Sequence, residues 1–162
     1  MSKQTNREAV EEFYRAFKQD KFIGARPSLE EDNISEERLF LKLDLILEEA
    51  SELIDAVLGE KSGSIIREAW VEAKAADEHN RDLIEAADAT GDLRYVIEGF
   101  DIETGIPSEP IFEEIHASNM SKLGEDGEPI LSDGTDGNPV GKILKGPGFF
   151  KPDIAGIIDI NS

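Results

Sequence analysis

The 162-residue sequence predicts an all-α protein that ends in a small β-hairpin arm. Apolar residues recur at helical spacing through most of residues 5–123, which is the pattern of amphipathic helices. Many of the 14 glycines fall between residues 124 and 148, together with repeated Asp-Gly dipeptides that are typical of tight hairpin turns. We therefore expect a helical domain over residues 1–123, with a C-terminal hairpin arm and tail of the same domain over residues 124–162.

Five helices are expected in the first of these segments. They are expected over residues 5–19, 35–59, 65–78, 81–103 and 109–123. The second begins at Ser35, whose hydroxyl suits the N-cap position, and it carries a wide apolar stripe. A loop over residues 60–64 is expected before the third helix, and a break around His79 is expected before the fourth.

The arm is expected to pair residues 129–132 with residues 141–145 as a short hairpin. The stretch Gly146-Pro147-Gly148 is expected to end the pairing, because it cannot continue a strand. The apolar residues that follow, Phe149 and Phe150, are expected to dock back on the helices.

Composition excludes several classes of protein. The formal net charge is −19, from 17 basic and 36 acidic residues, so nucleic-acid phosphates and anionic lipid would be repelled. The absence of cysteine excludes disulfides and thiolate chemistry. No apolar run reaches the ~18–20 residues of a membrane span, and the first residues lack the apolar core of a secretory signal. We therefore expect a soluble cytoplasmic protein with no nucleic-acid or membrane partner.

Acidic residues are concentrated on the second and the fourth expected helix. The second contains Glu48-Glu-Ala-Ser-Glu52, and the fourth contains Glu85-Ala-Ala-Asp88-Ala-Thr-Gly-Asp92. At about 100° per residue, the acidic residues of each stretch share one side of their helix, beside its apolar stripe. Small alanines around Asp88 would let two helices approach closely.

Two acidic helix faces have two interpretations. Either they are solvated surfaces, or they face each other and hold a hard divalent cation that removes their mutual repulsion. Carboxylate oxygens with no cysteine and with His116 elsewhere in the chain favour Mg²⁺ or Mn²⁺ over other metals. Residue types and spacing alone leave both interpretations open.

The two acidic stretches resemble a known pattern. Glu48-Glu-Ala-Ser-Glu52-Leu, followed by Glu85-Ala-Ala-Asp88 and Gly91-Asp-Leu-Arg-Tyr-Val96, is similar to the Glu-x-x-Glu, spacer, Glu-x-x-Asp pattern of the all-α nucleoside triphosphate pyrophosphohydrolases. That superfamily includes MazG, the dimeric dUTPases and phosphoribosyl-ATP pyrophosphohydrolase. The segments Ser118-Asn-Met-Ser-Lys122 and Lys145-Gly-Pro look like the MazG-like branch with a C-terminal arm, and the resemblance spans roughly residues 8–154.

The sequence departs from many MazG relatives at one position. In those relatives the Asp of Gly-Asp-Leu is the motif aspartate, with a glutamate three residues before it. The corresponding position here is Ala89, so the pattern shifts to Glu85 and Asp88. Asp92 is then either a further metal ligand or a residue that holds a ligand in place.

The resemblance implies a four- to five-helix MazG-like bundle that hydrolyses a nucleoside triphosphate between its α and β phosphates. It implies Mg²⁺ or Mn²⁺ as cofactor, with Glu48 as the general base or a bridging ligand. The implied metal ligands are Glu48, Glu49, Glu52, Glu85 and Asp88. The implied contacts to the β and γ phosphates are Asn119, Lys122 and Lys145, which the residues alone also allow to be an amide cap and surface lysines.

Three further expectations complete the sequence-based account. A homodimer or homotetramer is expected, because the family forms such oligomers and five helices of this size leave apolar faces open. The aromatic residues Phe13, Tyr14, Phe17 and Trp70 are expected to pack in the core. Two alternative functions stay open, phosphoribosyl-ATP pyrophosphohydrolase and a non-catalytic helical binding module with solvated acidic faces.

Overall fold

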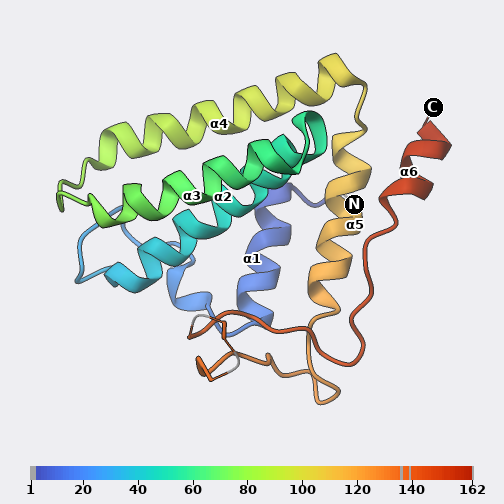
Figure 1. Ribbon diagram of the computed structural model, residues 1–162. Coiled ribbons are helices and arrows are strands. Elements are labelled where there is room, and N and C mark those ends of the chain that lie inside the picture. Colours follow the sequence, from blue (N-terminus) through green and yellow to red (C-terminus); the bar gives the residue numbers. More distant parts are fainter. Residues whose placement is uncertain (1–2, 136, 139, 162) are drawn as a thin grey trace. The chain divides into compact units, whose positions relative to one another are not determined.

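The computed structural model describes residues 3–135, 137–138 and 140–161, and within them the chain is all-helical, as predicted (Figure 1). The α-helices of the described residues are α1 (Asn6–Ala16), α2 (Glu36–Leu58), α3 (Glu60–Ala75), α4 (Leu83–Thr104), α5 (Ser108–Met120) and α6 (Ile154–Asn161). A short 3₁₀ helix, η1 (Asp20–Phe22), follows α1. No helix among the described residues is long and apolar enough to cross a membrane.

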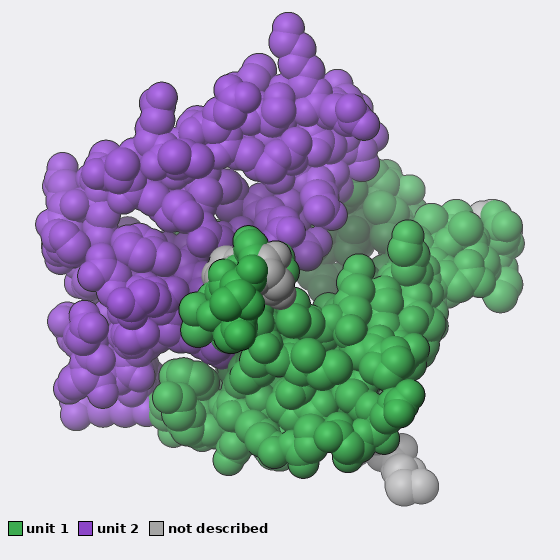
Figure 2. All heavy atoms as spheres, turned by 60° about the horizontal axis from the view of Figure 1, so that its bottom comes forward, with its two compact units in different colours: residues 1–25, 89–162 green, residues 26–88 purple. Residues whose placement is uncertain are grey.

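The chain divides into two compact units (Figure 2). Unit 1 comprises residues 1–25 and 89–162, and unit 2 comprises residues 26–88. In unit 1, α5 packs on α1 and α6 packs on α5, whereas in unit 2 the main packing is between α2 and α3. The helix α4 begins in unit 2 and continues into unit 1.

The helix starts follow local side-chain chemistry. Thr5 and Glu8 form a reciprocal capping box at α1, in which each side chain accepts a hydrogen bond from the other's backbone N–H, at 3.2 and 2.8 Å. The hydroxyl of Ser35 accepts a hydrogen bond from the Arg38 backbone N–H at 3.3 Å, which confirms Ser35 as the N-cap of α2. The predicted break after the third helix is also confirmed, because His79 has a φ of 55° between α3 and α4.

The predicted loop over residues 60–64 is wrong, because α3 starts directly after α2. Gly59 has a φ of 96°, which lets the chain reverse at a single residue. The two helices then approach closely at Gly63, whose backbone N–H donates to Asp55 Oδ1 at 3.0 Å. A side chain at position 63 would collide with Asp55 and with the Ser51 carbonyl, so the glycine permits this contact.

The predicted β-hairpin arm is also not supported. The described residues contain no strand there, only an isolated antiparallel bridge between Leu131 and Ile143, although Asp136 and Pro139 lie outside the described residues. Backbone hydrogen bonds flank the bridge, from the Ser132 N–H to the Lys142 carbonyl and from the Leu144 N–H to the Ile130 carbonyl, at 2.9 and 2.8 Å. Gly141 has a positive φ of 80°, so extended geometry stops at this end of the pairing.

The C-terminal tail docks on α5, as expected, but it ends in a helix that the sequence did not predict. Ser118 Oγ donates to the Phe150 carbonyl at 2.8 Å, and the Phe150 N–H donates to Ser121 Oγ at 3.1 Å. The Asp153 N–H donates to Glu114 Oε1 at 3.0 Å, immediately before α6 begins. These bonds fix the tail along one helix of unit 1.

Candidate active site

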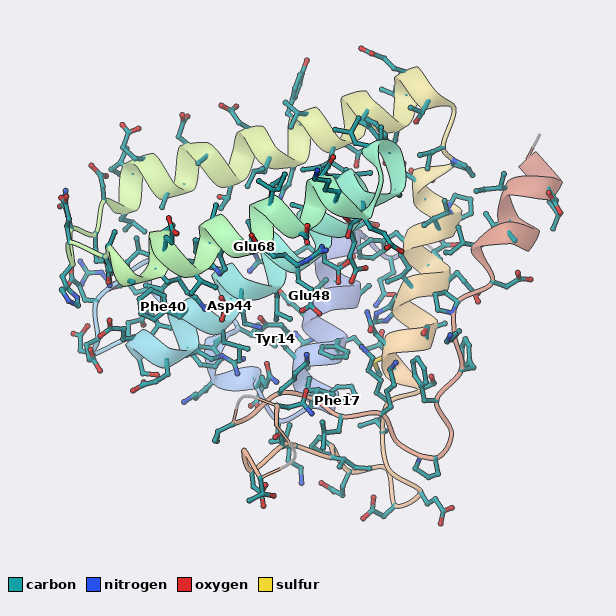
Figure 3. The ribbon with its side chains drawn as sticks, in the orientation of Figure 1. Tyr14, Phe17, Phe40, Asp44, Glu48 and Glu68 are labelled. Carbon is teal, nitrogen blue, oxygen red and sulfur yellow. The ribbon has the colours of Figure 1, made fainter. Side chains whose placement is uncertain are left out.

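The three glutamates of the α2 cluster, Glu48, Glu49 and Glu52, are exposed. Figure 3 shows Phe40, Asp44 and Glu48 following one another along α2. The side of α2 that carries Asp44 meets α3, so Glu48, four residues later, lies at the edge of that contact. At about 100° per residue, Glu52 and then Glu49 lie progressively further round the helix from α3.

Polar contacts fix how α2 meets α3. Trp70 Nε1 and Lys74 Nζ both donate to Asp44 Oδ1, at 2.6 and 2.7 Å. Partial burial raises the pKa of Asp44, but the hydrogen bonds from Lys74 and Trp70 outweigh it and lower the pKa below its usual value. One turn beyond Glu48, Arg67 Nη1 donates to the buried Ser51 hydroxyl at 3.0 Å. The carboxylate side of α2 is therefore held in a defined orientation.

On α4, the predicted residues Glu85, Asp88 and Asp92 are also exposed. Asp82 caps this helix, because its Oδ1 accepts hydrogen bonds from the Ile84 and Glu85 backbone N–H groups at 3.0 and 3.1 Å. The cap places the acidic stripe at the start of a well-formed helix, where the helix dipole favours anionic side chains.

A cleft of about 420 Å³ lies within unit 2 between the first turn of α4 and the other two helices. Ala86 of α4 and the capping residue Asp82 line it, opposite Phe40 and Leu43 of α2 and Trp70 of α3. This side of α4 therefore faces the α2 and α3 pair.

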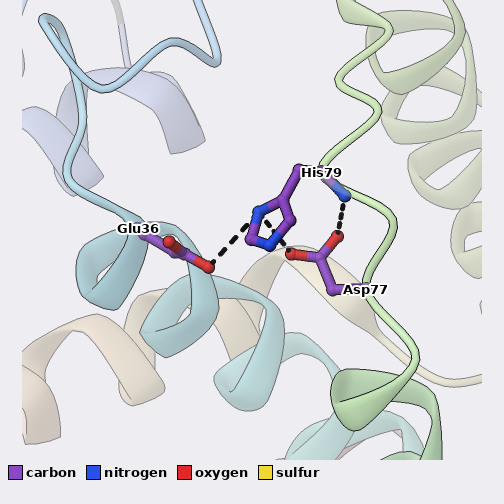
Figure 4. Close-up of side chains that lie close together, drawn as sticks. All are labelled: Glu36, Asp77 and His79. Carbon is purple, nitrogen blue, oxygen red and sulfur yellow. Dashed lines mark hydrogen bonds and ion pairs between the residues drawn. The ribbon is translucent and has the colours of Figure 1, made fainter.

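No three of the five predicted ligands have oxygen atoms within 4.8 Å of one another in the described part of the chain. In the described part of the chain, one group of three potential ligands has atoms within 4.8 Å of one another, namely Glu36, Asp77 and His79 (Figure 4). The five predicted ligands offer only carboxylate oxygens, a donor set that suits Mg²⁺ or Mn²⁺. Their chemistry therefore fits the implied cofactor, and their assignment stays a prediction.

The group of Glu36, Asp77 and His79 is an ion-pair network. Arg81 donates from both terminal nitrogens to the two oxygens of Asp77, at 2.7 and 2.8 Å. His79 Nδ1 lies 3.5 Å from Asp77 and 3.8 Å from Glu36. The Arg81 guanidinium neutralises Asp77. The contacts of His79 with Glu36 and Asp77 link the start of α2 to the connection between α3 and α4.

Two of the three residues expected to bind phosphate are hydrogen-bonded to each other in unit 1, and the third lies beside a backbone contact to one of them. Lys122 Nζ donates to Asn119 Oδ1 at 2.6 Å. The Gly146 N–H donates to the Lys122 carbonyl at 3.0 Å, and a side chain at position 146 would collide with the backbone of Leu123. Lys145 Nζ lies 4.5 Å from the centre of the Phe149 ring, a cation–π distance. The arm therefore brings Lys145 next to the end of α5.

The expected packing of the aromatic residues is confirmed for Phe17, which is 1% exposed and stacks on Phe13 with 4.1 Å between ring centres. Trp70 packs between helices through its bond to Asp44. Tyr14 instead lines a cleft of about 690 Å³ in unit 1, together with Arg94. Sequence reasoning missed this cleft, because its lining comes from residues far apart in the chain.

A family profile decides which protein family these residues represent. The profile of phosphoribosyl-ATP pyrophosphohydrolase matches residues 10–119, which is more than half of the chain and includes both acidic stretches. The chain belongs to the phosphoribosyl-ATP pyrophosphohydrolase family. It is therefore a pyrophosphohydrolase, a hydrolase of acid anhydrides, and the alternative of a non-catalytic binding module is set aside.

A solved structure is similar to this pyrophosphohydrolase in fold. It comes from Exiguobacterium sp. 255-15 and is provisionally described as an NTP pyrophosphohydrolase. The two share 23% of their residues with a TM-score of 0.65, and the match covers 99% of this chain and 95% of the other. No curated protein matches the chain. The two proteins therefore share one fold over nearly the whole length of both chains.

The ion-pair network of the pyrophosphohydrolase predicts how its stability changes at acid pH. Hydrogen bonds from Arg81 hold the pKa of Asp77 well below its usual value of about 4. A carboxyl with a lowered pKa in the folded state stabilises the protein above its ordinary pKa, and this stabilisation is lost as the pH falls further. The difference in free energy of unfolding between wild type and Asp77→Asn should therefore be largest at pH 7 and shrink below pH ~4, as measured by urea unfolding.

Asp32→Asn is a matched control, because Asp32 is an exposed aspartate in the same unit. A difference between wild type and Asp77→Asn that stays constant from pH 7 to pH ~3 would contradict the role given to Asp77.

Proposed function

We propose that this pyrophosphohydrolase cleaves a nucleoside triphosphate between the α and β phosphates and releases the monophosphate and pyrophosphate. The observation that carries the proposal is the family match over residues 10–119, which contains both acidic stretches. Release of pyrophosphate from a panel of nucleoside triphosphates with Mg²⁺ tests it, and the base that is turned over fastest then identifies the preferred substrate.

Mg²⁺, or Mn²⁺ in its place, is the proposed cofactor. The residues proposed to hold it are Glu48, Glu49, Glu52, Glu85 and Asp88, and Asp92 is proposed to keep one of them in position. When bound, the ion neutralises triphosphate charge and lowers the pKa of a coordinated water. Glu48, at the edge of the α2 and α3 contact, is proposed to take the proton from the attacking water.

Asn119, Lys122 and Lys145 are proposed to bind the β and γ phosphates. Their support is the bond between Asn119 and Lys122 and the backbone contact of Gly146 with Lys122, which puts the neighbouring Lys145 at the end of α5. In a chain with 17 basic and 36 acidic residues, a cluster of two lysines and an amide is suited to a phosphate. Each lysine acts as a point charge on a phosphate oxygen.

Binding of Mg²⁺ or Mn²⁺ is expected to raise the melting temperature of the protein without nucleotide. A ligand that binds only the folded state stabilises it by about 2.7 kcal/mol when present at a hundredfold excess over its Kd. A thermal scan with millimolar MgCl₂, compared with NaCl at equal ionic strength, measures the effect. Equal melting temperatures in the two salts would argue against a divalent-cation site.

A second candidate substrate is phosphoribosyl-ATP, which the family description itself favours. This reaction keeps the same metal ion and the same cleaved anhydride, and it differs in the base and ribose that the enzyme must accept. Including phosphoribosyl-ATP in the substrate panel separates the two candidates by their relative kcat/KM.

Self-association as a homodimer or homotetramer is also proposed. Among the described residues, only Ala9 and Phe17 are buried apolar residues. On α2, an exposed apolar stripe consists of Ile46, Leu53 and Val57. Exposed apolar stripes of this extent are typical of surfaces that another chain covers.

A further inference from the structure

We propose that Arg67 of α3 binds the triphosphate beside the α2 glutamates, through the N–H groups that its contacts within the chain leave free. The proposal rests on the proposed function, because it concerns the same substrate. It goes further by adding a basic residue of unit 2 to the phosphate contacts proposed in unit 1.

Two residues of α2 hold Arg67 beside Glu48 and Glu52. The Nη1 atom of Arg67 donates to Asp55 Oδ2 at 2.7 Å and to the Ser51 hydroxyl at 3.0 Å. Around α2, Asp55 lies about 20° from Glu48 and about 60° from Glu52. Each of the two anchoring residues lies less than one helical turn along α2 from one of the glutamates. The guanidinium is therefore held on the glutamate side of α2.

The anchors of Arg67 are themselves fixed. Ser51 is completely buried, and its hydroxyl donates to the Glu48 carbonyl at 2.9 Å. Asp55 Oδ1 accepts a hydrogen bond from the Gly63 N–H at 3.0 Å, in a close approach that a side chain at position 63 would prevent. An arginine that is already held in place loses less conformational freedom when it binds a ligand, so this arrangement favours binding.

Most of the hydrogen-bonding capacity of Arg67 is unused within the chain. A guanidinium has five N–H donors, and both contacts of Arg67 come from Nη1. The donors on Nε and Nη2 have no acceptor among the residues that the structure describes. The side chain is 44% exposed, so a ligand can reach it. Donors on one edge of a guanidinium match two oxygens of one phosphate.

The surrounding charge explains why a fixed cation matters here. Within eight residues α2 carries four carboxylates, namely those of Glu48, Glu49, Glu52 and Asp55. A triphosphate is strongly anionic, so it approaches this surface only where cations offset the repulsion. Among the described residues, the carboxylates of Glu48 and Glu52 form no hydrogen bond or ion pair. Arg67 is bound to their neighbours instead, so its charge adds to that of the proposed metal ion.

Binding of inorganic triphosphate in the presence of Mg²⁺ tests the proposal. Isothermal titration calorimetry at fixed ionic strength gives the Kd of wild type and of each variant. Arg67→Gln is expected to weaken binding by at least about tenfold, because a charge-assisted contact is lost. Arg67→Lys keeps the charge without the planar fork and should fall between the two. Arg26→Gln makes the same charge change at another exposed arginine of unit 2, and it should change the Kd by less than about twofold.

Asp55→Ala separates a phosphate contact from a purely structural link. Both Asp55→Ala and Arg67→Gln remove the ion pair that joins α2 to α3. If Arg67 only links the helices, the two substitutions should weaken triphosphate binding equally. If Arg67 contacts phosphate, Asp55→Ala should have a much smaller effect, because the guanidinium stays bound to Ser51 and a negative charge near the anion is removed. Thermal melting of each variant checks that it is folded.

The outcomes separate this proposal from the proposed function. Wild type that binds no triphosphate, Arg67→Gln with wild-type affinity, or equal effects of Arg67→Gln and Asp55→Ala would each overturn the contact, even if wild type releases pyrophosphate. If Arg67→Gln loses affinity beyond both controls but wild type turns over no substrate of the panel, the contact stands and the proposed hydrolysis fails. The same loss of affinity together with pyrophosphate release supports both.

Discussion

Glu85→Gln or Asp88→Asn is expected to lower the rate of pyrophosphate release by about a hundredfold to a thousandfold, while the protein stays folded. That magnitude is typical of removing one group that stabilises transition-state charge directly. Both residues are exposed on a capped helix, so the substitutions leave the helix and its contacts intact.

The metal-free protein should be as stable as wild type or more stable, because one repulsive carboxylate is removed. Steady-state pyrophosphate release under Mg²⁺ and thermal melting without metal measure the two effects. Glu103→Gln is the matched control, since Glu103 is an exposed glutamate at the opposite end of the same helix, about five turns from Glu85. Near-normal turnover in either site variant would show that α4 does not supply metal ligands.

Lys145→Ala is expected to lower kcat/KM by more than tenfold. A charge-assisted contact to a phosphate contributes ~1.5–3 kcal/mol, which corresponds to a factor of about ten or more. The bond from the Gly146 N–H to the Lys122 carbonyl holds the backbone of Lys145 next to the end of α5, where Asn119 and Lys122 lie. Stabilisation by Mg²⁺ without nucleotide should not change, because the lysine is not a metal ligand.

Lys151→Ala is the matched control for this variant, because Lys151 is an exposed lysine of the same tail. Small and equal effects of the two substitutions would show that the arm is only structural. The phosphates would then be bound by Asn119, Lys122 and the metal ion.

The sequence predicted most of the helices because their apolar periodicity and caps are local. Ser35 at the start of α2 and the break at His79 are both confirmed. The sequence-based prediction failed where a single backbone angle decides where a helix ends. Gly59 reverses the chain, so the loop predicted over residues 60–64 does not form. The sequence-based prediction also failed for the arm. Its turn-rich composition suggested a pair of strands, but the described residues form a single isolated bridge there.

The site shows a similar division between local and long-range information. Spacing alone placed Glu48 and Glu52 on one side of α2, and Glu85 and Asp88 on one side of α4. It could not show the polar pairs that orient α2 on α3, such as Asp44 with Trp70 and Ser51 with Arg67. Helix periodicity reveals apolar faces, and these pairs are not part of one.

The most direct test of the account is the identity of the products. The purified protein is incubated with Mg²⁺ and each substrate of the panel, including phosphoribosyl-ATP, and the products are followed by ³¹P NMR. The account predicts monophosphate and pyrophosphate in equal amounts from at least one substrate, with no release before Mg²⁺ is added. Orthophosphate with a diphosphate, or no turnover of any substrate, would contradict it.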